Sequence, residues 1–482
     1  MSIDNIMQQA ALAFDRYKQV EPVQRAAFLE TIAGEINVRR EQLVATAGRE
    51  TNLPDARLNG EINRTTFQLQ LFAQLIREGS WVEAVIDRQR ETPARADIRR
   101  MLLPVGPVVV FGASNFPFAF STAGGDTVSA LAAGATVVVK AHPAHGATSL
   151  LMFEAISTAI IKSDMPEHTV QHVTGGNEAG RELVMHPSTT AVGFTGSLAG
   201  GKALSAYASQ RETPIPVFAE MGSVNPVVFY PEALETRATQ LAETFAASVT
   251  LGAGQFCTNP GLLLGLEGEA FNRFQTLLHA AIEKTAPQKM LHTGIRHAFL
   301  QGRDGMLAQQ EVTLIGALPE TATAEDAPVA PSLAATTGSA FLANPHLREE
   351  VFGPYALLVA CRDKTELLQV LKTVKGQLTS SIMATDTDLS NWPDVIALQT
   401  TLAGRVILNA APTGVEVCAA MVHGGPFPAT TDARYTSVGT AAIRRWVRPV
   451  CFQGFPDQLL PDELKNNNPR GIWRLTDNEF TR

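Results

Sequence analysis

The stretch PVVVFGASNFPF, residues 107–118, marks the point where strands begin to alternate with helices along this chain. Its first part, 108–111, is an apolar run with the length and β-branched composition of a buried strand. Similar runs predict strands at 136–139, 170–173, 191–195 and 215–219, with helices at 120–133, 147–162, 177–185 and 199–209. This alternation predicts a doubly wound, mostly parallel α/β sheet, which binds its ligand at the carboxyl ends of the strands.

The turn after the first strand does not follow the Gly-x-Gly-x-x-Gly pattern and reads Gly-Ala-Ser-Asn-Phe-Pro at 112–117. Asn115 lies in this turn, so we expect its side-chain amide at the ligand-binding edge of the sheet. One interpretation is a hydrogen-bond donor to an oxyanion. The alternative is a loop asparagine that caps the helix after it.

A single thiol and a single carboxylate indicate chemistry further along the chain. Cys257 ends Gly-Gln-Phe-Cys at 254–257, after a glycine-rich turn where the backbone can approach a substrate closely. A cysteine thiolate can capture a carbonyl as a thiohemiacetal and hold it as a thioester. Glu220 ends an apolar run in Phe-Ala-Glu-Met-Gly at 218–222, a place where a carboxylate can act as an acid–base group in a cleft. The alternative for Cys257 is an ordinary buried free cysteine.

These motifs, Gly-Gln-x-Cys ending at Cys257 and Glu-Met-Gly-Ser-x-Asn-Pro beginning at Glu220, resemble the paired signatures of the aldehyde dehydrogenase superfamily. The resemblance implies NAD(P)-dependent oxidation of an aldehyde to a carboxylate. It makes Cys257 the covalent nucleophile and Glu220 the base that activates water for thioester hydrolysis. Asn115 and the backbone N–H of Cys257 then stabilise the oxyanion.

Further motifs in the same order resemble the family's cofactor site. Lys140 ends the second strand, where the family's lysine contacts the adenosine ribose. Phe-Thr-Gly-Ser-x-x-x-Gly at 194–201 opens a helix whose N-terminal N–H groups can bind pyrophosphate. Arg-Glu-Glu-Val-Phe-Gly-Pro at 348–354 resembles the motif around the nicotinamide and its ribose. The residues assigned in this way to NADP or NAD are Lys140, Gly176, Asn177, Thr195, Gly196, Ser197, Gly201, Glu350 and Phe352.

Pro143 bears on the choice between NADP and NAD. In many NAD-preferring relatives a glutamate stands three residues after the lysine, where it bonds the ribose 2′-hydroxyl and repels a 2′-phosphate. Because a proline occupies that position here, the sequence predicts that NADP is accepted at least as well as NAD.

The chain divides into three predicted parts. Residues 1–85 and 105–222 form a Rossmann-like NAD(P)-binding domain, which begins with helices. Residues 223–445 form a second α/β domain that carries Cys257 and includes a surface loop and strand at 317–337. Residues 86–104, with an exposed strand at 96–103, form a bridging β-hairpin, and 446–482 form a C-terminal arm. In the resembling family such a hairpin pairs subunits, which implies a homodimer or homotetramer.

The segment 421–431, Met-Val-His-Gly-Gly-Pro-Phe-Pro-Ala-Thr-Thr, departs from the common ending of the superfamily. It is similar to a branch that includes bacterial 2,5-dioxopentanoate (α-ketoglutaric semialdehyde) dehydrogenases and a bacterial fatty-aldehyde dehydrogenase. The resemblance favours oxidation of 2,5-dioxopentanoate to 2-oxoglutarate, with a medium- or long-chain aliphatic aldehyde as the alternative. His423 and Arg434 are candidates for holding a substrate carboxylate, and the alternative for both is a solvated side chain.

Two further classes stay open. A non-catalytic protein that kept an enzyme fold is one, although loss of Cys257 or Glu220 would be expected there. A CoA-acylating dehydrogenase is the other, and it is disfavoured because such enzymes generally do not retain the carboxylate found here as Glu220.

The composition excludes several other functions. The chain has 482 residues, 45% hydrophobic and 18% charged, which is ordinary for a globular protein of two or three domains. A net charge of −8 without a basic block gives no nucleic-acid-binding surface. Four cysteines stand far apart without metal-ligand spacing, so we expect no metal site and a reducing, cytoplasmic environment. No apolar run approaches the roughly 18 residues of a membrane span, so no membrane association is expected.

Overall fold

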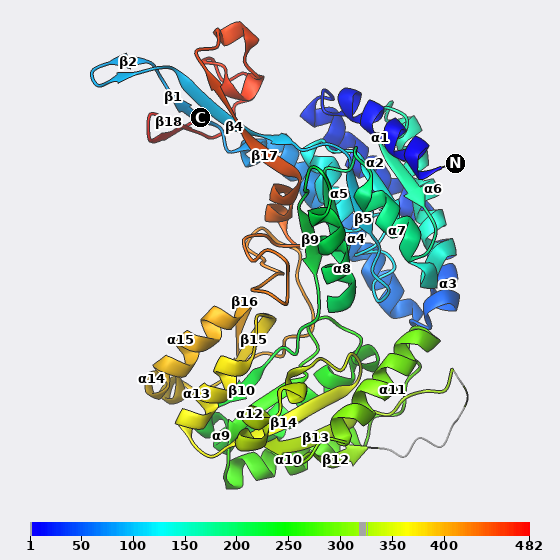
Figure 1. The fold of residues 1–482 in the computed structure, drawn as a ribbon, viewed down its shortest axis with the longest axis vertical. Helices are drawn as coiled ribbons and strands as arrows, with labels where there is room; N and C mark the ends of the chain where they lie inside the picture. Colours follow the sequence, from blue (N-terminus) through cyan, green and yellow to red (C-terminus); the bar gives the residue numbers. More distant parts are fainter. Residues whose placement is uncertain (1, 318–323, 325) are drawn as a thin grey trace.

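The computed structural model describes residues 2–317, 324 and 326–482. Figure 1 shows two α/β bodies, one above the other, and an arm of strands that projects from the upper body. Each part is built on one sheet, and we call these the upper sheet, the lower sheet and the arm sheet. The N-terminus lies on the upper body and the C-terminus in the arm.

The upper sheet has the strand order β7-β6-β5-β8-β9, and every pairing in it is parallel. Its strands are β5 (Val108–Phe111), β6 (Val137–Lys140), β7 (Val170–Val173), β8 (Ala191–Thr195) and β9 (Val217–Glu220). The predicted strands and the doubly wound parallel arrangement are therefore confirmed. Parallel pairing brings Lys140, Thr195 and Glu220, which end three of the strands, to the same edge of the sheet.

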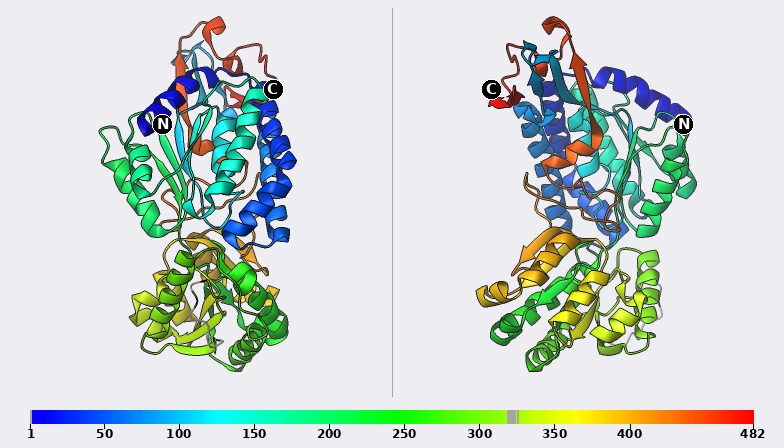
Figure 2. Two further views of the ribbon diagram at one scale, coloured as in Figure 1. Left: turned by 90° about the vertical axis from the view of Figure 1, so that its right-hand side faces the viewer. Right: turned by 60° about the vertical axis from the view of Figure 1, so that its left-hand side comes forward.

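Helices surround the upper sheet (Figure 2). They are α1 (Ile3–Tyr17), α2 (Pro22–Val38), α3 (Arg40–Thr51), α4 (Asp55–Glu78), α5 (Gly125–Ala133), α6 (Gly146–Lys162), α7 (Asn177–Met185) and α8 (Leu198–Ser209). The helix expected at 120–133 begins five residues later, at Gly125. Glu61 of α4 accepts hydrogen bonds from the N–H groups of Phe118 and Ala119 at 2.7 and 2.8 Å, and these bonds hold the chain before α5 in a turn.

The lower sheet has the order β12-β13-β14-β11-β10-β15-β16 and is parallel except for β12. Its strands are β10 (Val227–Phe229), β11 (Leu262–Leu266), β12 (Thr313–Ala317), β13 (Ser332–Thr337), β14 (Tyr355–Cys361), β15 (Gln377–Met383) and β16 (Ala403–Leu408). The helices of this body are α9 (Pro231–Thr250), α10 (Glu269–Ile282), α11 (Thr293–Leu307), α12 (Gly338–Ala343), α13 (Lys364–Thr373), α14 (Asp386–Asn391) and α15 (Pro393–Leu402). The strand expected near 337 is β13, whereas 318–323 and 325 lie outside the described residues.

The arm sheet joins the two segments that were predicted to act together, in the order β17-β4-β1-β18-β19. Its strands are β1 (Val85–Asp87), β4 (Ile98–Pro104), β17 (Val447–Gln453), β18 (Arg474–Thr476) and β19 (Glu479–Thr481), and β2 (Arg90–Glu91) pairs with β3 (Ala94–Arg95) at the tip. The strand expected to be exposed at 96–103 is only partly so. Arg99 and Met101 are buried. Arg99 donates hydrogen bonds to Leu464 and Asn466 of the C-terminal segment, and Met101 belongs to an apolar cluster with Leu460 and Leu464.

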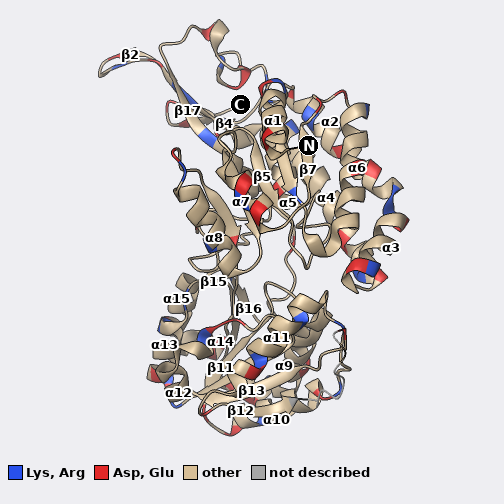
Figure 3. Cartoon of the chain, turned by 45° about the vertical axis from the view of Figure 1, so that its right-hand side comes forward, with Lys and Arg blue, Asp and Glu red and all other residues tan. Residues whose placement is uncertain are grey.

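One helical segment, Pro143–Lys162, is long and apolar enough by length and composition to cross a membrane, with a mean hydropathy of 1.3. The expectation that no apolar run would reach this length was therefore wrong. The helix packs against α2, α3 and β7 in the upper body, which is the behaviour of a core helix. Figure 3 shows acidic and basic residues interspersed over both bodies.

Candidate active site

Cys257 lies where the upper and lower bodies meet, directly after the short helical turn Leu251–Gly254. The backbone φ is +55° at Ala253 and +62° at Gly254, and a Cβ on Gly254 would lie 2.2 Å from the carbonyl oxygen of Gly353. Only glycine fits this close approach. Asn225 donates its side-chain N–H to the carbonyl of Cys257 at 2.9 Å, which fixes the backbone that carries the thiol.

Cys257 shares its surroundings with two buried side chains. Nε2 of His423 lies 3.4 Å from Sγ of Cys257 and 2.8 Å from Oε1 of Glu220. The hydroxyl of Ser437 donates to Oε2 of Glu220 at 2.5 Å. The structure therefore brings the predicted nucleophile and the predicted base together, and adds a histidine in contact with both.

The pKa values of the two acids in this group shift in opposite directions. Burial raises the pKa of the Cys257 thiol well above its ordinary value, and the nearby charge of Glu220 raises it further. Burial also acts to raise the pKa of Glu220, but the electrostatic influence of His423 and the hydrogen bonds from His423 and Ser437 outweigh it, so this pKa is lowered. At neutral pH the site holds a thiol beside a carboxylate.

The same three side chains could also coordinate a metal ion. Ligand atoms of Glu220, Cys257 and His423 all lie within 4.8 Å of one another. Their hydrogen bonds to one another are what proton transfer requires. The expectation of no metal site stays a prediction.

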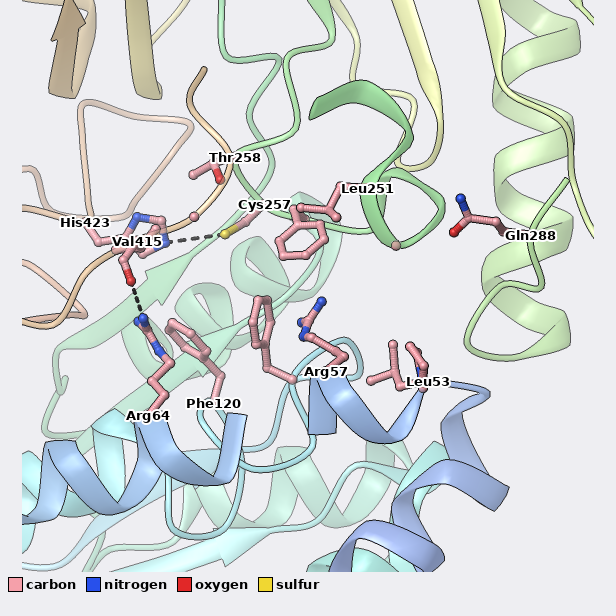
Figure 4. A pocket seen from close by; sticks show the side chains of 15 residues that line it. Leu53, Arg57, Arg64, Phe120, Leu251, Cys257, Thr258, Gln288, Val415 and His423 are labelled. Atoms are coloured by element: carbon pink, nitrogen blue, oxygen red, sulfur yellow. Dashed lines mark hydrogen bonds between the residues drawn. The ribbon is translucent and has the colours of Figure 1, made fainter. Parts of the chain in front are cut away.

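Two cavities meet at Cys257, and both are also lined by Phe116 and Phe120. The first, of about 370 Å³, runs from the start of α8 to Cys257 and includes Glu220 in its wall. The second, of about 330 Å³, lies on the side of α4 and includes His423. Figure 4 shows the thiol of Cys257 and the side chains of α4 facing each other across this second cavity.

The first cavity collects many of the residues assigned to the cofactor. Thr195, Gly196, Ser197, Glu350 and Phe352 line it together with Glu220 and Cys257. The remaining assigned residues, Lys140, Gly176, Asn177 and Gly201, are not among its lining residues. Lys140 ends β6, at the same edge of the upper sheet, and Gly176 precedes α7.

The residues at the start of α8 have the chemistry that the pyrophosphate of a dinucleotide requires. Ser197 caps α8 by accepting a hydrogen bond from the N–H of Gly200 at 3.2 Å, and the first turn of a helix leaves N–H groups that can bind pyrophosphate. A Cβ on Gly201 would lie 2.4 Å from Sδ of Met221, and one on Gly222 would lie 2.4 Å from Oε2 of Glu350. These glycines let α8 and the 348–354 segment close around the cavity.

Asn115 lines the first cavity beside Cys257, as an oxyanion donor must. Its side-chain N–H donates to the carbonyl of Gln255 at 3.1 Å. An amide nitrogen carries two hydrogens, so this bond orients the group and leaves the second hydrogen for a ligand. The alternative, a cap on the next helix, fails because α5 begins at Gly125 and is capped by Gly124.

Of the two residues offered for a substrate carboxylate, His423 lines the second cavity and Arg434 lines neither cavity. His423 is 1% exposed and is bonded to Glu220. Arg434 is exposed and paired with Asp432, and it is not among the described lining residues of either cavity. Two arginines that sequence reasoning missed, Arg57 and Arg64, line the second cavity. Their spacing of seven residues in the 55–78 helix was the available signal.

The chain is similar in sequence and in fold to known aldehyde dehydrogenases. The model of the aldehyde dehydrogenase family matches residues 1–426. The chain is 47% identical over 479 residues to alpha-ketoglutaric semialdehyde dehydrogenase 2 of Azospirillum brasilense, covering 98% of this chain and 91% of the relative. It is 47% identical over 485 residues to the alpha-ketoglutaric semialdehyde dehydrogenase of Acinetobacter baylyi, covering 99% and 91%. A betaine aldehyde dehydrogenase variant from Staphylococcus aureus has the same fold, with a TM-score of 0.80 at 18% identity over 94% of this chain and 88% of that one.

Proposed function

The chain belongs to the aldehyde dehydrogenase family, and from this premise we propose that it oxidises 2,5-dioxopentanoate to 2-oxoglutarate with NADP or NAD. Oxidation of an aldehyde with an NAD(P) cofactor follows from the family. Support for this substrate comes from two relatives named for alpha-ketoglutaric semialdehyde, which is the same compound, at 47% identity over nearly the whole chain. The observation that carries the chemistry is the contact of Cys257 with the buried side chains of Glu220 and His423, where two cavities meet.

In the first step Cys257 attacks the aldehyde carbon. Its thiol proton is lost to solvent through the cavities that Cys257 lines, so Glu220 stays unprotonated for the later hydrolysis. The new C–S bond leaves an alkoxide on the former carbonyl oxygen. Asn115 and the backbone N–H of Cys257 donate to this oxyanion.

The wall of the first cavity, with Lys140 outside it, would hold the cofactor beside Cys257. We assign the pyrophosphate to the start of α8, the nicotinamide ribose to Glu350, the nicotinamide side to Phe352 and the adenosine ribose to Lys140. NAD(P) bound there would supply the hydride acceptor for oxidation of the captured aldehyde to a thioester.

In the last step water cleaves the thioester. Glu220 accepts a proton from the water as its oxygen bonds to the acyl carbon, and the C–S bond breaks to release the carboxylate and Cys257. His423 and Ser437 hold Glu220 in its unprotonated form and fix its direction. His423 is therefore a positioning residue for Glu220.

A second candidate substrate is a medium- or long-chain aliphatic aldehyde. The observation that favours it is the apolar wall of the second cavity, which contains Phe116, Phe120, Leu251 and Phe256. The test is a steady-state comparison of kcat/KM for 2,5-dioxopentanoate and for straight-chain aldehydes, with each cofactor. A kcat/KM that is tenfold or more higher for long aldehydes, about 1.4 kcal/mol of discrimination, would reject 2,5-dioxopentanoate.

We also propose that residues 1–85 and 105–222 act as the cofactor domain, 223–445 as the catalytic domain, and the arm as the contact between subunits of a homodimer or homotetramer. Support for the contact is a group of large apolar side chains that the arm exposes, namely Phe455, Leu459, Trp473 and Phe480. Light scattering of wild type and of Leu459→Asp tests the contact between subunits.

A cytoplasmic location is supported by four free cysteines.

A further inference from the structure

Helix α4 presents a charged row to the second cavity. Arg57, Glu61 and Arg64 stand at positions i, i+4 and i+7, so they share one face of the helix. Both arginines line the cavity that contains Cys257, and Figure 4 shows their side chains reaching from α4 toward it. The reaction at Cys257 uses neither of them.

Arg57 is held rigidly by aromatic rings. Its guanidinium carbon lies 4.5 Å from the ring centroids of both Phe116 and Phe256. It donates one hydrogen bond, to the carbonyl of Asn115 at 3.4 Å. A guanidinium packed in this way keeps its charge and most of its five N–H donors.

Arg64 is also fixed and only partly bonded. It donates to the carbonyl of Val415, and its guanidinium carbon lies 5.7 Å from the ring centroid of Phe120. Its buried Nε has no hydrogen-bond partner among the residues that the structure describes. An unpaired buried donor costs free energy until a ligand satisfies it.

Glu61 offsets the two cations only in part. Its Oε1 accepts the two backbone hydrogen bonds before α5, and its Oε2 lies 4.0 Å from Nε of Arg57 with no hydrogen bond. Burial also raises the pKa of this carboxyl. The cavity therefore carries two arginines against one buried carboxylate.

We propose that Arg57 and Arg64 bind the carboxylate at the far end of the substrate while the aldehyde at the other end reaches Cys257. The substrate class is then a short ω-aldehyde carboxylate, and the cavity of about 330 Å³ is at the small end of ligand sites. Charge-assisted and bidentate hydrogen bonds from arginine make such a contact strong and directional. The aromatic rings around the arginines keep water away from it. This inference rests on the proposed function and extends it to the residues that select the substrate.

The test compares two matched aldehydes, 5-oxopentanoate and its neutral methyl ester. In Arg64→Gln we expect kcat/KM for 5-oxopentanoate and for 2,5-dioxopentanoate to fall about a hundredfold, mainly through KM, with less than about a threefold change for the ester. Arg64→Lys should keep part of the preference because it keeps the charge. The matched control is Arg77→Gln, on the same helix but paired with Glu30 at the surface. It should leave kcat/KM for both substrates unchanged.

A second measurement does not depend on turnover. Glutarate should inhibit wild type competitively against the aldehyde and should bind Cys257→Ala equally well. Arg57→Gln or Arg64→Gln should weaken glutarate binding by about the same factor by which it lowers kcat/KM for 5-oxopentanoate. Equal losses for the anion and the ester, or unchanged glutarate inhibition, would overturn the assignment of the arginines. A wild type that oxidises aldehydes but not 2,5-dioxopentanoate would instead overturn the proposed function.

Discussion

Nε2 of His423 lies 2.8 Å from Oε1 of Glu220, although the two residues are 203 positions apart in the chain. Both side chains are almost wholly buried. A lone carboxylate in such a place would be protonated, because burial raises the pKa of an acid. The contact with His423, reinforced by Ser437, reverses this and lowers the pKa of Glu220.

The first prediction concerns His423→Asn. Without the imidazole, burial dominates and the pKa of Glu220 rises, so the carboxylate is protonated over a wider acid range. Thioester hydrolysis needs the unprotonated form, so its acid limb should move to higher pH, by roughly one unit or more. Single-turnover rates of hydrolysis across pH measure this shift. A loss of the same size at every pH would contradict it, and Ser437→Ala should give a smaller shift in the same direction.

The second prediction concerns turnover in Glu220→Gln. The amide cannot accept a proton from water, so the enzyme should form its thioester and then stop. Rapid-quench kinetics should show a burst of reduced cofactor of about one equivalent per site, followed by a steady rate roughly a hundredfold or more below wild type. Steady turnover at the wild-type rate after the burst would reject Glu220 as the base.

The third prediction concerns the reactivity of the Cys257 thiol in the same variant. The charge of Glu220 raises the pKa of Cys257, so Glu220→Gln should lower this pKa and increase the thiolate fraction. Without cofactor, iodoacetamide should therefore modify Cys257 faster in the variant than in wild type near pH 8. Peptide mass spectrometry can follow each cysteine, and the exposed Cys451 is the internal control. Slower modification would mean that Glu220 promotes ionisation of the thiol.

The fourth prediction is that Cys257→Ala abolishes dehydrogenase turnover and leaves cofactor binding nearly intact. Only covalent capture is lost, because the residues of the first cavity that are assigned to the cofactor are unchanged. Turnover above about one per cent of wild type would reject the nucleophile. Fluorescence titration with NADPH checks that the cofactor site is preserved.

Local patterns in the sequence were enough to predict the upper sheet. Valine-rich runs of four residues bounded by turns have few alternatives to buried parallel strands, and β5 and β6 follow them. The start of α5 could not be predicted in this way. It depends on Glu61, a residue of α4 that bonds the turn before α5 from a distant part of the chain.

The residues of the site also differ in whether a local sequence pattern reveals them. Cys257 and Glu220 stand in motifs of contiguous residues, so a resemblance finds them. His423 was noticed but interpreted as a carboxylate ligand, because nothing local shows that its imidazole is buried against Glu220. Arg57 and Arg64 belong to a helix whose charged residues resemble those of any solvated face until the fold places them against Cys257.

The last prediction concerns the choice of cofactor and depends on the segment after β6. Lys140 ends that strand and is largely buried, and among the described residues it has no ion pair within 4.0 Å. Pro143 is exposed three residues later, at the start of a short helical turn. His142 adds no charge there, since burial and the neighbouring His145 lower its pKa to about 3. The segment 140–143 therefore offers a 2′-phosphate one lysine and no carboxylate of its own, which favours acceptance of NADP.

Pro143→Glu should add the repulsive charge that this segment lacks. We expect kcat/KM for NADP to fall about tenfold or more while kcat/KM for NAD stays level or rises, since only NADP carries the 2′-phosphate. Pro143→Gln is the matched control, because it also removes the proline but adds no charge, and it should leave the ratio of the two cofactors near that of wild type. The interpretation of Pro143 is wrong if glutamate and glutamine act alike. It is also wrong if wild type prefers NAD by more than about a hundredfold, roughly 2.7 kcal/mol, because a site without a repelling carboxylate has no physical reason to exclude the phosphate that strongly.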